Sequence, residues 1–112
     1  MGFAMADLAF LTRLEATLRD RRNADPATSY VAMLHARGTA KIAQKLGEEA
    51  VETIIAALAE DDAALTGEAA DLLFHLLVLL DARGLSLADV VAELAHREGV
   101  SGVAEKASRS PA

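Results

Sequence analysis

The stretch Lys-Leu-Gly-Glu-Glu-Ala-Val-Glu at residues 45–52 decides the fold, together with Glu-Ala-Ala-Asp at residues 68–71. Both stretches are typical of helices, in which successive residues turn by about 100°. That rotation places the acids of each stretch on one side of its helix. The first side carries Lys41, Lys45, Glu48, Glu49 and Glu52, and the second carries Glu68, Asp71 and His75. Two acidic helix faces of this kind need a partner, because like charges one turn apart repel each other.

A divalent cation is the simplest partner for these acids. A ligand set made only of oxygen atoms suits a hard cation such as Mg²⁺ or Mn²⁺. In proteins, Mg²⁺ usually binds a few carboxylates together with the phosphates of a substrate. Lys41 and Lys45 could meet those phosphates as point charges. The alternative is a solvated charged surface. The second acidic face lies on a helix that is otherwise apolar all round, and this favours a metal site.

The composition predicts a single all-α domain. The chain has 112 residues, of which 53% are hydrophobic, and it contains only two prolines. Ala and Leu dominate, and both are strong helix formers. A chain of this length can form one hydrophobic core. We expect a four- to five-helix bundle over residues 1–103, followed by a flexible tail over residues 104–112, which has no apolar period.

The charge balance and the termini exclude several classes of partner. The formal net charge is −6, whereas binding to a nucleic-acid backbone needs clustered Lys and Arg. The absence of cysteine excludes disulfides and zinc–thiolate sites. The N-terminus has no basic region of the kind that begins a secretory signal. The longest apolar run, residues 72–80, is too short to span a bilayer. We therefore expect no nucleic acid and no membrane as partners, and the sequence is compatible with the cytoplasm.

Hydrophobic spacing predicts five helices, at about residues 7–22, 27–36, 40–59, 67–82 and 87–98. Four of these helices are preceded by a residue that can cap them, namely Asp25, Thr39, Thr66 and Ser86, the last in a capping box with Asp89. Leu8 in the first helix is expected to face the core, as are Val91 and Leu94 in the last.

The fourth predicted helix is apolar around nearly its whole circumference. Residues 72–80 are all hydrophobic except for His75. A helix with this pattern is buried on all sides, and a chain of this size has few elements with which to surround it. We therefore expect a second copy of the chain to cover this helix, in a homodimer or a higher homo-oligomer.

Five polar residues near helix ends have competing interpretations. Glu68 and Asp71 fall in the early turns of the helix predicted to begin at residue 67, where the helix dipole alone would favour them. His75 lies one turn after Asp71 and is interpreted as a residue that orients a metal ligand without binding the metal itself. The alternative is a core histidine. His35 is expected at the surface. Arg37 could reach a phosphate or cap helix carbonyls.

The two acidic stretches also support a family assignment. Their pattern, EExxE followed by ExxD, resembles the signature of the all-α nucleotide pyrophosphatases of the MazG-like superfamily. Within that superfamily the chain resembles the phosphoribosyl-ATP pyrophosphatases from about residue 8 to residue 97. The likeness is carried by the runs SY at 29–30, KIAQKLGEE at 41–49, AADLLFHLLVLL at 69–80 and RGLSL at 83–87.

The resemblance implies a reaction and an assembly. The reaction is the second step of histidine biosynthesis, in which phosphoribosyl-ATP and water give phosphoribosyl-AMP and pyrophosphate with Mg²⁺ required. The assembly is an intertwined cytoplasmic homo-oligomer of all-α bundles, with helices from two chains around each site.

The residue chemistry is compatible with that reaction. Cleavage of a phosphoanhydride needs positive charge on the phosphate oxygens and a positioned water. Lys45, with Lys41, would hold the triphosphate, and Glu48 would orient or deprotonate the water. The acids expected to hold the metal are Glu49, Glu52, Glu68 and Asp71.

Three other functions remain open from the sequence. A house-cleaning pyrophosphatase for noncanonical nucleoside triphosphates would use the same acids and differ in base recognition. A di-iron bundle would need two Glu-x-x-His pairs, and only Glu93 with His96 has that form. A helical dimerisation module would explain the apolar helix but leave the acidic faces without a role.

Overall fold

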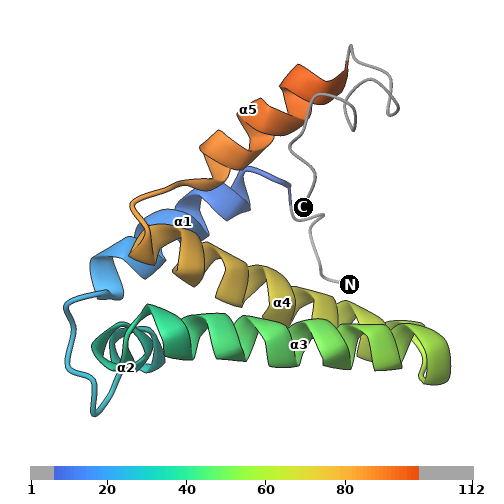
Figure 1. Cartoon of the computed structure of the whole chain (residues 1–112), viewed down its shortest axis with the longest axis horizontal. Coiled ribbons are helices and arrows are strands. Elements are labelled where there is room, and N and C mark those ends of the chain that lie inside the picture. The colour runs from blue at the N-terminus through green and yellow to red at the C-terminus, as the bar shows by residue number, and fades with distance from the viewer. Residues whose placement is uncertain (1–6, 99–112) are drawn as a thin grey trace.

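The computed structural model describes residues 7–98 and consists, over that range, of helices and their connections (Figure 1). The helices are α1 (Phe10–Arg21), α2 (Tyr30–Arg37), α3 (Thr39–Ala59), α4 (Asp62–Ala82) and α5 (Leu87–Glu98). The predicted all-α class is therefore confirmed. The expected tail at 104–112, and the end of the domain at residue 103, lie outside the described residues.

A long hairpin of α3 and α4 forms the base of the molecule (Figure 1). Each of these helices has 21 residues, so at 1.5 Å per residue each is about 30 Å long. α1 and α2 pack across the end of the hairpin where α3 begins and α4 ends. The other end of the hairpin, near the α3–α4 turn, extends beyond them.

The core lies where α1, α2, α3 and α4 meet. Its most completely buried large side chains are Leu34, Ile42, Leu77 and Val78, and Leu18 of α1 packs on the same cluster. Full burial of an aliphatic side chain contributes about 1.5–3 kcal/mol. This cluster fixes α2 against α3 and α4, and it thereby holds the first residue of α2, Tyr30, close to the middle of α4.

The start of α2 differs from the sequence prediction. Asp25 does not cap the helix; its Oδ1 accepts a hydrogen bond from the Ala27 N–H at 2.9 Å, in a turn that precedes it. The N-cap is Ser29, whose Oγ accepts from the Ala32 N–H at 3.2 Å. The prediction was wrong because the turn begun by Asp25 continues through residue 28, so the helix starts at Tyr30.

The starts of α3 and α4 also differ from the prediction. Thr39 is the first residue of α3, and Gly38 stands at the N-cap position. α4 begins at Asp62, with Asp61 as its N-cap accepting from the Ala64 N–H at 2.8 Å. Thr66 lies inside α4, where its hydroxyl donates to a carbonyl one turn back. A threonine can satisfy its hydroxyl in this way within a helix, so its presence did not mark a helix start.

The first and last helices are less buried than their apolar spacing predicts. Leu8 precedes α1 and is 83% exposed, and Val91 and Leu94 of α5 are 54% and 58% exposed. α5 diverges from the hairpin instead of packing along it (Figure 1). The predicted capping box is confirmed, since the Ser86 N–H donates to Asp89 Oδ2 at 2.9 Å and the Asp89 N–H donates to Ser86 Oγ at 3.4 Å.

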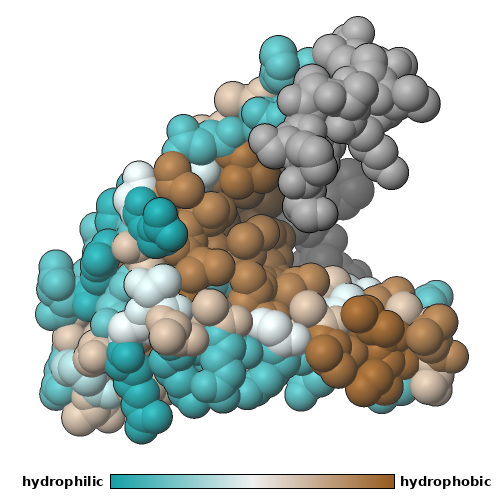
Figure 2. All heavy atoms as spheres, viewed as in Figure 1, coloured by the Kyte–Doolittle hydropathy of each residue, from teal (hydrophilic) through white to brown (hydrophobic). Residues whose placement is uncertain are grey.

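Apolar surface remains uncovered in the single chain. Figure 2 shows hydrophobic residues gathered between α5 and the hairpin and again toward the α3–α4 turn. The second area includes exposed apolar residues of α3, namely Val51, Ile54, Ile55 and Leu58. Among the described residues, α4 is the one helix long and apolar enough to cross a membrane. The apolar run at 72–80 is only part of this helix, which extends from Asp62 to Ala82, so the shortness of the run does not exclude a membrane span. A core helix of a soluble protein passes the same test.

Candidate active site

The α3–α4 hairpin brings three predicted metal ligands together. Glu49 of α3 and Glu68 and Asp71 of α4 each offer a carboxylate oxygen, and these three oxygens lie within 4.8 Å of one another. Glu49 is only 9% exposed, Glu68 is half-buried, and Asp71 is exposed. The cluster thus has a closed side toward the core and an open side toward solvent.

The carboxylates of this cluster raise one another's pKa. The pKa of Glu68 is raised by hydrogen bonding with Glu52, then by burial. Burial raises the pKa of Glu49, and the nearby charges of Glu52 and Asp71 raise it further. Glu49 Oε2 and Glu68 Oε2 are both buried without a hydrogen-bond partner. Because buried acceptors are normally paired, these oxygens fit a hard cation.

Glu52 lies beside the cluster but outside the set of three oxygens. Glu52 raises the pKa of both Glu49 and Glu68. Glu52 and Glu68 also line an open hollow of about 310 Å³, with Ile55 and Glu60 completing the wall. The fourth predicted ligand therefore borders the cluster on its solvent side.

Glu48 is not among the three clustered carboxylates and is held by two neighbours. Lys45 Nζ donates to Glu48 Oε1 at 3.2 Å, and Gln44 Nε2 donates to Glu48 Oε2 at 2.8 Å. Hydrogen bonds from Gln44 and Lys45 lower the pKa of Glu48, and the hydrogen bond to Glu48 raises the pKa of Lys45. The residue predicted to act on the water is thus an exposed carboxylate paired with the residue predicted to hold phosphate.

The two other predicted phosphate-binding residues, Lys41 and Arg37, precede Lys45 in the chain. Lys41 is half-buried one turn before Lys45, and its charge also lowers the pKa of Glu48. Arg37 is exposed at the last position of α2. Lys41 and Lys45 therefore share one face of α3, whereas Arg37 belongs to the preceding helix.

His75 lies behind the carboxylate cluster and connects it to α2. It is 5% exposed, and its Nδ1 lies 2.7 Å from the Asp71 backbone carbonyl oxygen. Its Nε2 lies 2.7 Å from the Tyr30 hydroxyl. His75 therefore touches the backbone of a predicted ligand rather than its carboxylate. Tyr30 was not predicted as part of the site, because helical spacing does not show which side chain of another helix it meets.

One alternative interpretation of the acids is excluded by where α4 begins. If α4 began at residue 67, the helix dipole could account for Glu68 and Asp71. The helix begins at Asp62, so Glu68 lies beyond the first turn and Asp71 further still. Because the dipole acts mainly within the first turn, it does not explain why these acids are there.

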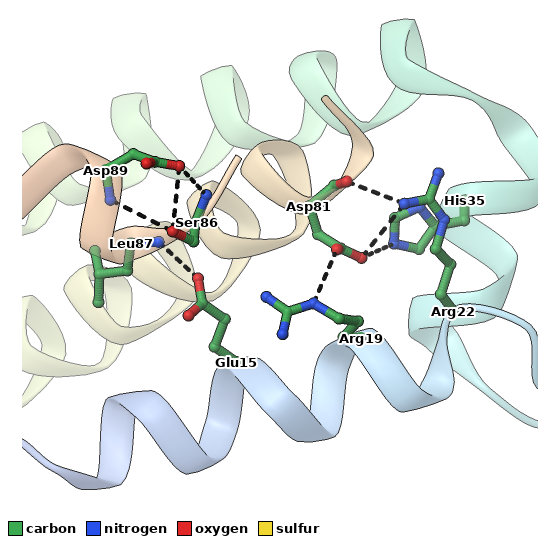
Figure 3. A network of polar contacts seen from close by, with 8 residues as sticks. All are labelled: Glu15, Arg19, Arg22, His35, Asp81, Ser86, Leu87 and Asp89. Carbon is green, nitrogen blue, oxygen red and sulfur yellow. Dashed lines mark hydrogen bonds and ion pairs between the residues drawn. The ribbon is translucent and has the colours of Figure 1, made fainter. Parts of the chain in front are cut away.

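A second polar network surrounds Asp81 near the end of α4 (Figure 3). Asp81 Oδ1 lies 3.6 Å from Arg19 Nε, and Asp81 Oδ2 lies 3.7 Å from Arg22 Nη1 and 3.5 Å from His35 Nε2. Arg22 also donates to the Asp81 backbone carbonyl at 3.0 Å. The prediction that His35 is a surface residue was wrong, since its side chain is 8% exposed. Burial, then the charge of Arg22, lowers its pKa, with Asp81 opposing.

The Asp81 network is continued by a contact that ties α5 to α1. Glu15 Oε2 accepts a hydrogen bond from the Leu87 N–H at 2.6 Å, beside the capping box that starts α5 (Figure 3). Both ends of the connection between α4 and α5 are thus anchored on α1. This network stabilises the arrangement of helices that positions the carboxylate cluster.

Comparison with known proteins gives one consistent result. The phosphoribosyl-ATP pyrophosphohydrolase family model matches residues 11–98. Among curated proteins, a phosphoribosyl-ATP pyrophosphatase of Novosphingobium aromaticivorans is 66% identical, covering 89% of this chain and 94% of the relative. Relatives of the same name from Rhizorhabdus wittichii and Zymomonas mobilis are 67% and 61% identical, each covering 88% of this chain and 93% and 92% of the relative.

The matched region contains the whole α3–α4 hairpin and its carboxylate cluster, together with Tyr30 and the Asp81 network. The family expected from the EExxE and ExxD motifs is thereby confirmed over most of the chain. The chain belongs to the phosphoribosyl-ATP pyrophosphohydrolase family.

Proposed function

We propose that this chain hydrolyses phosphoribosyl-ATP to phosphoribosyl-AMP and pyrophosphate, the second step of histidine biosynthesis, in a Mg²⁺-dependent reaction. The family match supports the hydrolase activity and its substrate. The observation that carries the metal dependence is the pair of buried, unpartnered oxygens of Glu49 and Glu68 within a cluster of carboxylates.

Glu49, Glu68 and Asp71 would hold the cation, with Glu52 completing the set from the solvent side. When bound, Mg²⁺, or Mn²⁺ in its place, would supply positive charge to the phosphate oxygens of the substrate. Glu49, which is 9% exposed, would form the side of the site that faces the core.

Lys45 and Lys41 would bind the triphosphate from the same face of α3, with Arg37 contributing from the end of α2. In the structure Lys45 is paired with Glu48 at 3.2 Å. An arriving phosphate would compete for the Lys45 ammonium and release one oxygen of Glu48. That carboxylate would then be available to orient or deprotonate the attacking water, as general-base action requires.

The assembly proposed here is a homodimer or a higher homo-oligomer in the cytoplasm, with neither nucleic acid nor membrane as a partner. The uncovered apolar residues of α3 and the half-buried leucines of α4 support it. Light scattering at micromolar concentration should give at least a dimer. A folded monomer would contradict this part of the proposal and leave the family assignment unchanged.

The decisive assay offers the purified chain phosphoribosyl-ATP and, separately, ATP, dUTP and dCTP, each with Mg²⁺. The products should be phosphoribosyl-AMP and pyrophosphate, without orthophosphate. Glu49→Gln should nearly abolish turnover while the far-ultraviolet circular dichroism stays unchanged, because it removes a ligand and preserves volume. Glu98→Gln is the matched control, since Glu98 is exposed at the end of α5, and it should behave like the parent. Rapid hydrolysis of dUTP or dCTP, without hydrolysis of phosphoribosyl-ATP, would instead support a house-cleaning enzyme.

Metal binding can be tested without substrate. A ligand that binds only the folded state raises the melting temperature by mass action. Mn²⁺ should therefore raise the melting temperature of the parent more than that of the double variant with Glu52→Gln and Asp71→Asn. Equal shifts in the two proteins would remove these acids from the proposed metal site.

A further inference from the structure

Tyr30 has a hydrogen-bonding arrangement that its position at the start of α2 does not require. Its hydroxyl lies 2.7 Å from His75 Nε2, and His75 Nδ1 lies 2.7 Å from the Asp71 carbonyl oxygen. A backbone carbonyl can only accept, so His75 Nδ1 must carry a hydrogen and donate it. In the neutral ring Nε2 is then an acceptor. With His75 in this neutral form, the Tyr30 O–H donates to His75 Nε2.

This arrangement uses the only hydrogen of the Tyr30 hydroxyl. A phenol has one O–H donor and lone pairs that accept. Burial, partly opposed by the charge of Lys45, raises the pKa of Tyr30, so the phenol keeps its hydrogen at neutral pH. Toward the site, the Tyr30 oxygen can then only accept a hydrogen bond. A phosphate oxygen is also an acceptor, so Tyr30 is not suited to bind phosphate while it remains paired with His75.

The Tyr30 side chain lies at the open edge of the site. The residue is 43% exposed, and it lies close enough to Lys45, Glu49 and Asp71 for their charges to act on its hydroxyl. The ring is supported by Phe74, at 6.2 Å between ring centroids with 26° between the planes. Its edge-on contact with His75, at 5.7 Å between centroids, fixes the ring from a second direction.

We propose that Tyr30 is a substrate-contact residue whose oxygen accepts a hydrogen bond from an O–H donor of the bound substrate complex, with His75 as the residue that positions it. The donor is either a sugar hydroxyl of the substrate or a water on the cation. This inference rests on the proposed function, since the nearby Lys45 and carboxylates are where the triphosphate and cation would bind. The group next to a triphosphate in a nucleotide is its sugar, which carries hydroxyls.

The expected effect is moderate, because a single neutral hydrogen bond is lost. Net contributions of such bonds correspond to about a 3- to 10-fold change in an equilibrium constant. Tyr30→Phe removes the hydroxyl and keeps the ring against Phe74. If the sugar is the donor, KM for phosphoribosyl-ATP should rise by about that factor while kcat changes less than about twofold. If water on the cation is the donor, Mn²⁺ affinity measured without substrate should fall by about the same factor.

The positioning part of the inference is tested by a double-mutant cycle with His75→Leu. Without the His75 acceptor, the Tyr30 O–H is free to rotate and donate elsewhere, so the Tyr30→Phe effect on KM or on Mn²⁺ affinity should disappear. Two residues with independent structural roles would instead give additive effects. Thermal melts of all four proteins verify folding, and Thr17→Val, which removes a hydroxyl from the exposed side of α1, controls for general effects.

The outcomes separate this inference from the proposed function. A folded Tyr30→Phe variant with parental KM and parental Mn²⁺ affinity, differing only in melting temperature, would overturn the inference and reduce Tyr30 to a packing residue. A parent that does not hydrolyse phosphoribosyl-ATP would overturn the proposed function. In that case, a loss of Mn²⁺ affinity in Tyr30→Phe would still support the water on the cation as the donor.

Discussion

Replacement of Asp81 by Asn should destabilise the protein without touching the carboxylate cluster. Asp81 is 9% exposed, and its carboxylate is the shared partner of Arg19, Arg22 and His35 (Figure 3). The substitution keeps the volume and removes the negative charge. Asp81 Oδ2 is a buried acceptor near Arg22 and His35. If the amide nitrogen of asparagine takes the place of Oδ2, a donor will face other donors.

The size of the effect follows from distance and exposure. Two unit charges about 3.6 Å apart interact by about 1 kcal/mol in water and about 4–5 kcal/mol at an effective dielectric constant near 20. The side chains of Arg19 and Arg22 are 54% and 41% exposed, so the lower part of this range applies to each pair. We expect Asp81→Asn to lower the free energy of unfolding by about 2 kcal/mol. For a domain of this size, that corresponds to a fall of about 10 °C in melting temperature.

The measurement is urea unfolding followed by circular dichroism, with thermal melts in parallel. Asp20→Asn is the matched control, because Asp20 is an exposed acid of α1, and it should unfold within about 0.5 kcal/mol of the parent. If Asp81→Asn proved as stable as Asp20→Asn, the ion pairs in Figure 3 would contribute nothing measurable to the free energy of unfolding. That result would refute the predicted destabilisation.

Four further predictions concern His35, Gly38, Gly47 and Ser86. Burial lowers the pKa of His35 in the folded state, so neutral His35 contributes stability above pH 6.5 that is lost as the pH falls below that value toward the lowered pKa. Between pH 7 and pH 5, denaturant unfolding of the parent should therefore lose more stability than that of His35→Gln; parallel curves would contradict the pKa shift. Gly38→Ala should cost about 1–3 kcal/mol by thermal denaturation, because φ is 99° although the space for a Cβ is open. Gly47→Ala, inside α3 and equally open, should be neutral or stabilising by up to about 1 kcal/mol. Ser86→Ala should cost about 1 kcal/mol by removing one half of the capping box, whereas an unchanged melting temperature would show that α5 does not limit stability.

The acids of the carboxylate cluster could be grouped from the sequence because they lie on two helices with clear periodicity. A helical period fixes which side chains share a face, and that information sufficed to group Glu49 with Glu52 and Glu68 with Asp71. It did not show which residues of the acidic face of α3 lie opposite which residues of the acidic face of α4. The pairing of Glu48 with Gln44 and Lys45 is a choice of side-chain conformation that spacing does not encode.

The contacts that the sequence could not predict join residues far apart in the chain. Tyr30 meets His75, and His35 meets Asp81, and both pairs depend on how α2 crosses α4. Local signals also misplaced the starts of α2 and α4 by several residues, because Asp25 and Thr66 form hydrogen bonds in a turn and inside a helix that resemble those of a cap. The start of α3 was misplaced by one residue. The exposure of Val91 and Leu94 has a different origin, since an apolar face shows that something covers it without saying whether the cover belongs to the same chain.

Gly38 is at once the C-cap of α2 and the N-cap of α3, so the two helices meet at an elbow of a single residue. α2 then acts as a rigid arm, about 12 Å long at 1.5 Å per residue, with Tyr30 at its far end. A change of about 10° in the direction of the arm would move that end by about 2 Å, which is enough to break the 2.7 Å hydrogen bond to His75. The position of Tyr30 relative to the carboxylates therefore depends on the backbone angles of Gly38. A small change in those angles produces a larger displacement of Tyr30 at the site.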